Sequence, residues 1–142
     1  MSTVPQTALN ANQTLSLSVQ GQADLMQREG VIRHYYDDAV NNCTYGVGTL
    51  AHAGPCSPQE LSISLSDKQV VASMQSGIEV AEGAIYRNVT RYPLTQKQFD
   101  ALVSFTYNVG SGGAQDVLRL INQGQLAKAV NLMMLYVHAT VY

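Results

Sequence analysis

The sequence of 142 residues has few charged residues, and their signs nearly balance. Only 13% of the residues are Asp, Glu, Lys or Arg, which argues against a highly charged disordered chain or a long coiled coil. Eight Lys and Arg against ten Asp and Glu give a formal net charge of −2, so a basic surface for nucleic acid is not expected. The length fits one domain, or one compact domain with two lobes.

Long apolar runs are also missing. The longest, from Leu132 to Val137, is far shorter than the roughly 20 residues that cross a bilayer, so no membrane span is expected. The first 22 residues lack the basic start and the continuous apolar stretch of a secretory signal. The sequence therefore predicts a protein that is made in the cytoplasm and is not exported by its own N-terminus.

Potential metal ligands are scarce. The cysteines are Cys43 and Cys56, and the histidines are His34, His52 and His138. A zinc site needs four ligands, and the histidines show no paired spacing, so neither a metal nor another cofactor is expected. A nucleophilic Cys43–His52 dyad and a Cys43–Cys56 disulfide both stay open. The disulfide would close a loop of about 14 residues and stabilise the fold by roughly 3 kcal/mol in an oxidising compartment.

The first part of the chain changes character several times. Residues 1–17 are rich in Ser, Thr, Asn and Gln and predict a polar lead-in or linker before a domain over residues 18–142. A short helix is expected over residues 18–28, ended by Gly30. The stretch 31–50 mixes strand formers with turn residues and predicts a small antiparallel hairpin or three-stranded sheet.

Two capping boxes mark the main helices. Ser66 and Gln69 precede an apolar face of about 20 residues, which predicts a helix of roughly 30 Å, long enough to join two lobes. Thr95 and Gln98 form the second box, before a segment that is apolar almost all round and therefore typical of a helix buried at a domain centre.

Glycines divide the last part of the chain. The cluster at 110–113 is expected to end the buried helix, and Gly124 to separate two further helices over residues 115–122 and 125–137. With one small β element near the front, these patterns predict a mainly α (α+β) fold.

Candidate catalytic groups gather in one segment. Glu29 at a helix end and Asp38 in a polar turn lie in different environments, and such a pair of carboxyl groups can divide acid and base roles. Thr44 begins a strand with its hydroxyl free to hold a water molecule. Gly46 and Gly48 let a flat ligand approach the backbone closely.

Each of these residues also has a purely structural explanation. A Glu at a helix end is most often a solvated charge, and an Asp in a turn usually caps its own backbone. Asp37 competes directly with Asp38 for any role. The residues by themselves therefore leave the catalytic assignment open.

The spacing E-G-x7-D-x5-T-x-G-x-G over residues 29–48 resembles the phage-type (T4-like and lambdoid) lysozymes, the endolysin muramidases. The segment from Leu94 to Gly110 is similar to the central buried helix of that family. The resemblance covers roughly residues 20–137. It implies a lysozyme-like two-lobed fold, in which a long helix joins a small β-hairpin lobe to a helical lobe.

The resemblance also implies an activity, hydrolysis of the β-1,4 bond between N-acetylmuramic acid and N-acetylglucosamine in bacterial peptidoglycan. By position, Glu29 matches the general acid, and Asp38 matches the carboxylate that activates or positions water. Thr44 matches the third catalytic residue, which helps to hold that water. T4-like members are inverting, and inversion needs room for water between the two carboxyl groups.

Four further positions match residues that line the saccharide cleft of the family: Gly48, Leu50, Tyr107 and Asn108. For Leu50 and Tyr107, ordinary core packing is a nearly equal alternative.

The chain departs from the family pattern in three respects. Thr49 stands where many members carry His. The closing segment with an Arg-Arg-Glu-like cluster is expected to be absent after Tyr142, and the charge is mildly acidic where many lysozymes are basic. Two rival functions therefore stay open: a catalytically weak peptidoglycan-binding module of the same fold, and a thiol hydrolase built on Cys43.

The route to the cell wall is a separate expectation. Without a signal peptide, the protein would act in the periplasm either as an endolysin that passes a membrane pore or as an antibacterial effector. An effector would have a secretion machine and an inhibitory immunity protein as partners. The polar lead-in and the Cys43/Cys56 pair favour the effector. A disulfide would brace the loop between Asp38 and Thr44 in that compartment.

Overall fold

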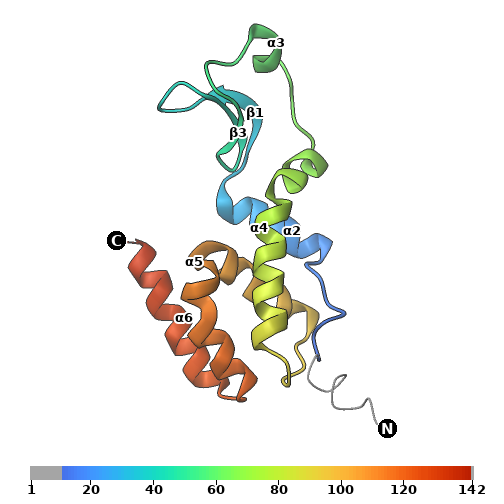
Figure 1. The fold of residues 1–142 in the computed structure, drawn as a ribbon, viewed down its shortest axis with the longest axis vertical. Helices are drawn as coiled ribbons and strands as arrows, with labels where there is room; N and C mark the ends of the chain where they lie inside the picture. Colours follow the sequence, from blue (N-terminus) through green and yellow to red (C-terminus); the bar gives the residue numbers. More distant parts are fainter. Residues whose placement is uncertain (1–10, 142) are drawn as a thin grey trace. The chain divides into compact units, whose positions relative to one another are not determined.

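A computed structural model describes residues 11–141 of the chain (Figure 1). Most of the predicted lead-in, residues 1–10, lies outside the described residues. The elements are α2 (Val19–Glu29), β1 (Ile32–Asp37), β2 (Cys43–Gly46), β3 (Thr49–His52), α3 (Pro58–Leu61), α4 (Asp67–Asn88), α5 (Gln96–Asn122) and α6 (Leu126–Val141). The strands form one antiparallel sheet in the order β1-β2-β3, so the mainly α (α+β) class is confirmed. Over residues 11–141, no helix has the length and apolar character that a membrane span requires.

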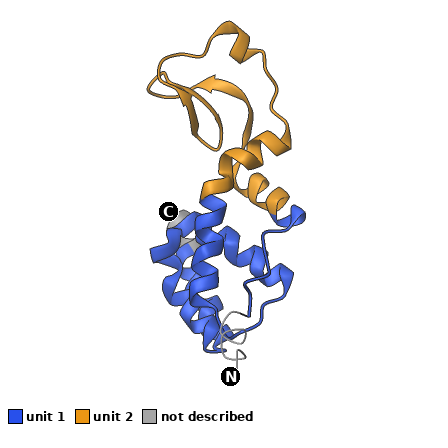
Figure 2. Ribbon diagram, turned by 45° about the vertical axis from the view of Figure 1, so that its right-hand side comes forward, with its two compact units in different colours: residues 1–21, 77–142 blue, residues 22–76 orange. Residues whose placement is uncertain are grey.

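The chain divides into two compact units (Figure 2). Among the described residues, unit 2 comprises residues 22–76 and holds the sheet, while unit 1 comprises those up to residue 21 and from residue 77 onward and holds α5 and α6. Helix α4 contributes residues to both units. The predicted division into a small β lobe and a helical lobe that share one long helix is therefore confirmed.

The sheet of unit 2 places Thr44 on its central strand. Thr44 pairs with Tyr36 of β1 on one side and with Leu50 of β3 on the other. The register between β2 and β3 shifts between Cys43 and Thr44, so the ladder is irregular at this point. The buried apolar side chains of unit 2 are Leu25, Met26, Cys43, Cys56, Leu65, Val70 and Met74.

Both predicted capping boxes are present. The Gln69 N–H donates to Ser66 Oγ at 3.2 Å, and the Ser66 N–H donates to Gln69 Oε1 at 2.8 Å. Thr95 and Gln98 exchange the same two bonds at the start of α5. Each box satisfies two N–H groups that a helix start leaves without an intrahelical partner, which is why these two helices begin where the sequence predicts.

Within the segment expected to be a polar lead-in or linker, Asn12 and Leu17 are buried and belong to unit 1. Asn12 is 1% exposed, and its carboxamide donates to the carbonyls of Val89 and Tyr92, both at 2.8 Å. The same carboxamide accepts from the Leu94 N–H at 2.8 Å. Leu17 is buried as well. Because a buried, fully bonded amide side chain is costly to remove, this segment is part of the folded unit.

The glycine cluster was expected to end the buried helix, and α5 has a kink there. Gly110 is non-helical, with φ 83° and ψ 160°, so the range of α5 holds two helical segments, and the second begins directly after Gly110. Glycine reaches this positive φ without the steric cost that a Cβ imposes. The first half of α5 is buried on several sides, as predicted, through Phe99, Leu102, Val103, Ser104, Phe105 and Thr106. The sequence reading missed the short helix α3, and α6 runs further than residue 137.

Candidate active site

Glu29 is the last residue of α2, and the backbone fixes its place. Gly30 has φ 66°, and its N–H donates to the Met26 carbonyl at 3.1 Å, which closes the helix. The nearby side chains of Leu25 and Met26, on the same helix, are buried. The Glu29 side chain itself is half-buried. A carboxyl group is thus held at the junction between α2 and β1.

Asp38 lies in the turn that follows β1, and its own loop binds one of its carboxylate oxygens. Oδ1 accepts from the N–H groups of Val40 and Asn42, at 3.0 and 2.9 Å. The pKa of Asp38 lies below its usual value. The main cause is the N–H of Asn42, followed by the N–H of Val40 and the hydroxyl of Thr44. Hydrogen bonds to the ionised form favour that form. Asp38 is therefore a carboxylate at neutral pH.

Thr44 faces the other carboxylate oxygen of Asp38. Its side chain is buried (3% exposed), and Oγ1 lies 3.1 Å from Asp38 Oδ2 and 3.1 Å from the Asn42 carbonyl oxygen. A hydroxyl has one proton, so it donates to one of these acceptors at a time while its own oxygen can still accept. A carboxylate and a hydroxyl that are bonded to each other in this way can both contact one water molecule beside them.

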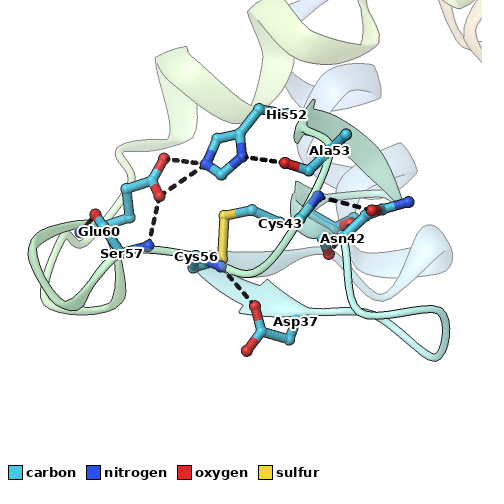
Figure 3. A network of polar contacts seen from close by, with 10 residues as sticks. Asp37, Asn42, Cys43, His52, Ala53, Cys56, Ser57 and Glu60 are labelled. Carbon is cyan, nitrogen blue, oxygen red and sulfur yellow. Dashed lines mark hydrogen bonds and ion pairs between the residues drawn. A yellow bond between two sulfur atoms is a disulfide. The ribbon is translucent and has the colours of Figure 1, made fainter.

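The structure separates the two neighbouring aspartates. Asp37 has a different partner, because its Oδ1 accepts from the Cys56 N–H at 2.7 Å (Figure 3). Successive residues of a strand point to opposite faces, which explains the divergence at the end of β1. Of the two aspartates, Asp38 is the one that contacts Thr44. This contact favours Asp38 over Asp37 as the candidate that acts together with Thr44.

A disulfide joins Cys43 of β2 to Cys56, with a Cα–Cα distance of 4.7 Å (Figure 3). Neither cysteine is free, so no thiol remains for a nucleophilic dyad of Cys43 with His52. The thiol-hydrolase alternative is therefore wrong for this structure. Glu60 lies close to the two sulfur atoms, but sulfurs bonded to each other do not offer the thiolates that a metal site would need.

His52 of β3 contacts Glu60, the residue that lies close to the disulfide. Its Nε2 lies 2.8 and 2.9 Å from the carboxylate oxygens of Glu60, and its Nδ1 lies 2.9 Å from the Ala53 carbonyl oxygen (Figure 3). Both partners only accept, so the doubly protonated ring satisfies both. Accordingly the Ala53 carbonyl, and then Glu60, raise the pKa of His52. The Ser57 N–H, and then His52, lower the pKa of Glu60.

The four residues matched to the saccharide cleft lie in different units. Gly48 is exposed in the turn between β2 and β3, where an added Cβ would meet nothing within 4 Å. Leu50 of β3 is 58% exposed, so the alternative of core packing is wrong for it. Tyr107 and Asn108 belong to α5 in unit 1. Tyr107 packs against Gly77, where an added Cβ would lie 2.8 Å from the ring.

Sequence reasoning missed the residues that support Asp38 and Thr44. Asn42 counted only as turn material, yet its side-chain Oδ1 accepts from the Gly54 N–H at 2.9 Å. The contacts of Asp37 with Cys56 and of His52 with Glu60 were missed as well. These partners are 8 to 19 positions apart in the sequence, and no local motif signals them.

The candidate site lies within the part of the chain that is similar to known proteins. The phage lysozyme family model matches residues 26–141, which include Glu29, Asp38 and Thr44. The endolysin of Bacillus phage B103 is 31% identical over 109 residues, covering 72% of this chain and 38% of the endolysin. The chain spans 38% of the length of the curated relatives that it matches.

Solved structures give the same result. The muramidase domain of SpmX from Asticaccaulis excentricus aligns with a TM-score of 0.65 and 26% identity, covering 86% of this chain and 80% of that one. The endolysin from Escherichia coli O157:H7 phage FAHEc1 aligns with a TM-score of 0.61 and 27% identity, covering 82% and 75%. The lysozyme-like fold and the match over most of the sequence lead to one conclusion: the chain belongs to the phage lysozyme family.

Proposed function

We propose that this chain is a glycoside hydrolase of bacterial peptidoglycan, a muramidase that cleaves the β-1,4 bond between N-acetylmuramic acid and N-acetylglucosamine. The observation that carries the proposal is the Asp38–Thr44 pair, 3.1 Å apart, in a chain of the phage lysozyme family. The names of its relatives, endolysins and a muramidase domain, support the same chemistry.

The proposed mechanism divides the work between two carboxyl groups. Glu29 donates a proton to the glycosidic oxygen as the bond to the anomeric carbon breaks. Asp38 and Thr44 orient a water molecule, whose oxygen bonds to that carbon while Asp38 takes its proton. Such a direct displacement inverts the anomeric configuration and requires the carboxyl groups to stand about 6.5–9.5 Å apart. Gly48 and Leu50 in unit 2, and Tyr107 and Asn108 in unit 1, are the proposed saccharide contacts.

The place of action is part of the proposal. A disulfide between Cys43 and Cys56 fits a protein that works in an oxidising compartment such as the bacterial periplasm. We infer that it reaches the wall as an endolysin or as an effector carried by a secretion machine, with an immunity protein as inhibitor in the second case. Free thiols in protein recovered from the periplasm would contradict the role of the disulfide.

Substitution of Glu29 by Gln tests the activity. On purified peptidoglycan, release of muropeptides should fall at least about 100-fold, because general acid catalysis contributes on that order. Mass spectrometry and reducing-end analysis of the products identify the bond that is cleaved. Glu79→Gln, the same change on the exposed surface of α4, is the matched control and should retain activity.

Two outcomes would contradict the proposal. If the unsubstituted chain binds peptidoglycan and releases nothing, it is a binding module of the same fold. If Glu29→Gln retains full activity, another group supplies the proton.

A further inference from the structure

Asn42 contacts Asp38 and Thr44, the two groups proposed to orient water, and also Gly54 in the segment next to the disulfide. Its backbone N–H donates to Asp38 Oδ1 at 2.9 Å, and its carbonyl accepts from the Asp38 N–H at 3.0 Å and from Thr44 Oγ1 at 3.1 Å. Its side-chain Oδ1 accepts from the Gly54 N–H at 2.9 Å (Figure 3). One residue thus holds Asp38 and Thr44 with its backbone and is itself held by its carboxamide.

The segment that holds Asn42 is fixed at several points. We name residues 53–56, together with the Cys43–Cys56 disulfide, the bracket. Within it the Gly54 carbonyl accepts from the Cys43 N–H at 2.8 Å, and the Cys56 N–H donates to Asp37 Oδ1 at 2.7 Å. Gly54 is therefore tied to β2 by its carbonyl and lies two residues from a covalent link. The Asn42 carboxamide is therefore bonded to a segment that is held by a disulfide and by two further hydrogen bonds.

The sheet supports the residues after Asn42 on one side only. Cys43 and Thr44 pair in regular register with Asp37 and Tyr36 of β1, whereas the β2–β3 register shifts between Cys43 and Thr44. Asn41, on the other side, has a left-handed backbone with φ 65°, which is uncommon for a residue other than glycine. The backbone around Asn42 is thus irregular before it and, towards β3, after it. The bond from the Gly54 N–H to Asn42 Oδ1 is an additional restraint at this point.

We propose that Asn42 is a positioning residue, which transmits the rigidity of the bracket to Asp38 and Thr44 through its bond to Gly54. The role rests on the proposed function, because it matters for catalysis only if Asp38 and Thr44 act on water. Asn42 does not touch substrate in this proposal. It fixes the two groups that hold the water, and misplacing such groups by about 1 Å is enough to slow a reaction strongly.

Asn42→Ala removes the anchor but keeps the disulfide and a backbone N–H at position 42. On solubilised peptidoglycan fragments we expect kcat to fall about tenfold and KM to change by less than about twofold. The acid limb of the pH profile should move to higher pH, because the Asn42 N–H that stabilises the Asp38 carboxylate is no longer held in position. The other ionisable groups around this loop, Asp37, His52 and Glu60, are unchanged in this variant.

Two further variants separate positioning from general loss of stability. Asn42→Asp keeps an oxygen that accepts from Gly54, and should restore turnover at pH values well above the acid limb. His52→Ala breaks the contact with Glu60 on the other side of the disulfide, and should lower the melting temperature without moving the acid limb. If Asn42→Ala does not fold, Asn42→Gln, which displaces the same amide by one methylene group, carries the same readouts.

An NMR titration of the Asp38 carboxyl carbon tests the positioning independently of activity. In Asn42→Ala, Asp38 should titrate at higher pH than in the unsubstituted protein. A folded Asn42→Ala with an unchanged Asp38 titration and unchanged kcat would overturn the proposal, and so would an equal kcat loss in His52→Ala. Absence of hydrolysis by the unsubstituted chain would overturn the proposed function instead, while the titration would still decide whether Asn42 positions Asp38.

Discussion

Asp38 uses its two carboxylate oxygens for different purposes. Oδ1 accepts from two backbone N–H groups of its own turn, and Oδ2 faces the hydroxyl of Thr44. An aspartate that caps its turn and an aspartate that works on water were alternative interpretations of the sequence. Here the structural contact and the proposed catalytic contact involve different oxygens, so one side chain has room for both. The turn also keeps the carboxylate ionised, as a base requires.

A pair of isosteric substitutions distinguishes Asp38 from Asp37. Asp38→Asn keeps an oxygen for the backbone N–H groups but loses the negative charge, so muropeptide release should fall at least about 100-fold. Asp37→Asn keeps an oxygen that accepts from the Cys56 N–H, and its activity should stay within about threefold of the unsubstituted protein. Initial rates on purified peptidoglycan measure both. A reversed order of the two losses would show that the assignment to Asp38 is wrong.

At the scale of elements, locally encoded features were predictable and long-range contacts were not. The starts of α4 and α5 follow from Ser and Thr caps whose partners lie three residues away. Asn12 bonds to carbonyls 77 and 80 positions away, and the polar sequence around it predicted a linker. The catalytic candidates Glu29, Asp38 and Thr44 had a fixed spacing in one short segment, whereas the supporting contact of Asn42 with Gly54 arises only when the loop folds back.

The link between β3 and α3 should make stability depend on pH. The pKa of His52 is raised in the folded state, so its contribution is fully present below the unfolded pKa of about 6.5 and is lost as the pH rises through the folded value. The pKa of Glu60 is lowered, so its contribution is present above the unfolded value of about 4.3 and is lost as the pH falls through the folded value. The pair therefore stabilises most between about pH 4.3 and 6.5.

Melting temperatures measured across pH test this link. The difference in Tm between the unsubstituted protein and His52→Ala should be largest in that window and should shrink towards pH 9. Glu60→Gln should show the same loss, and adding His52→Ala to it should change Tm little, since both variants break one contact. A difference in Tm that does not vary with pH would show that His52 stabilises by packing alone.

At the scale of the whole molecule, each of the two units is stabilised by a different set of interactions. Unit 2 has a small apolar core and relies on the Cys43–Cys56 disulfide next to its sheet. Unit 1 buries a larger apolar set on α4, α5 and α6, and Asn12 ties the N-terminal segment to it. Burying each large apolar side chain contributes about 1.5–3 kcal/mol. Loss of the disulfide should therefore affect the two units unequally.

Hydrogen exchange on a disulfide-free variant tests this inequality. Replacing both Cys43 and Cys56 by Ala opens a loop with a sequence separation of 13, and should cost about 3 kcal/mol through the entropy of the unfolded chain. Protection of the β2 amides should fall accordingly, while the slowest amides of α5 keep theirs.

Asn12→Ala is the reciprocal variant, because it leaves the Leu94 N–H without its acceptor and should lower protection in unit 1 by about 1–3 kcal/mol. Equal loss in both units from either substitution would mean that the chain opens as one cooperative body, because local unfolding of separate units lowers protection only where the contact is lost.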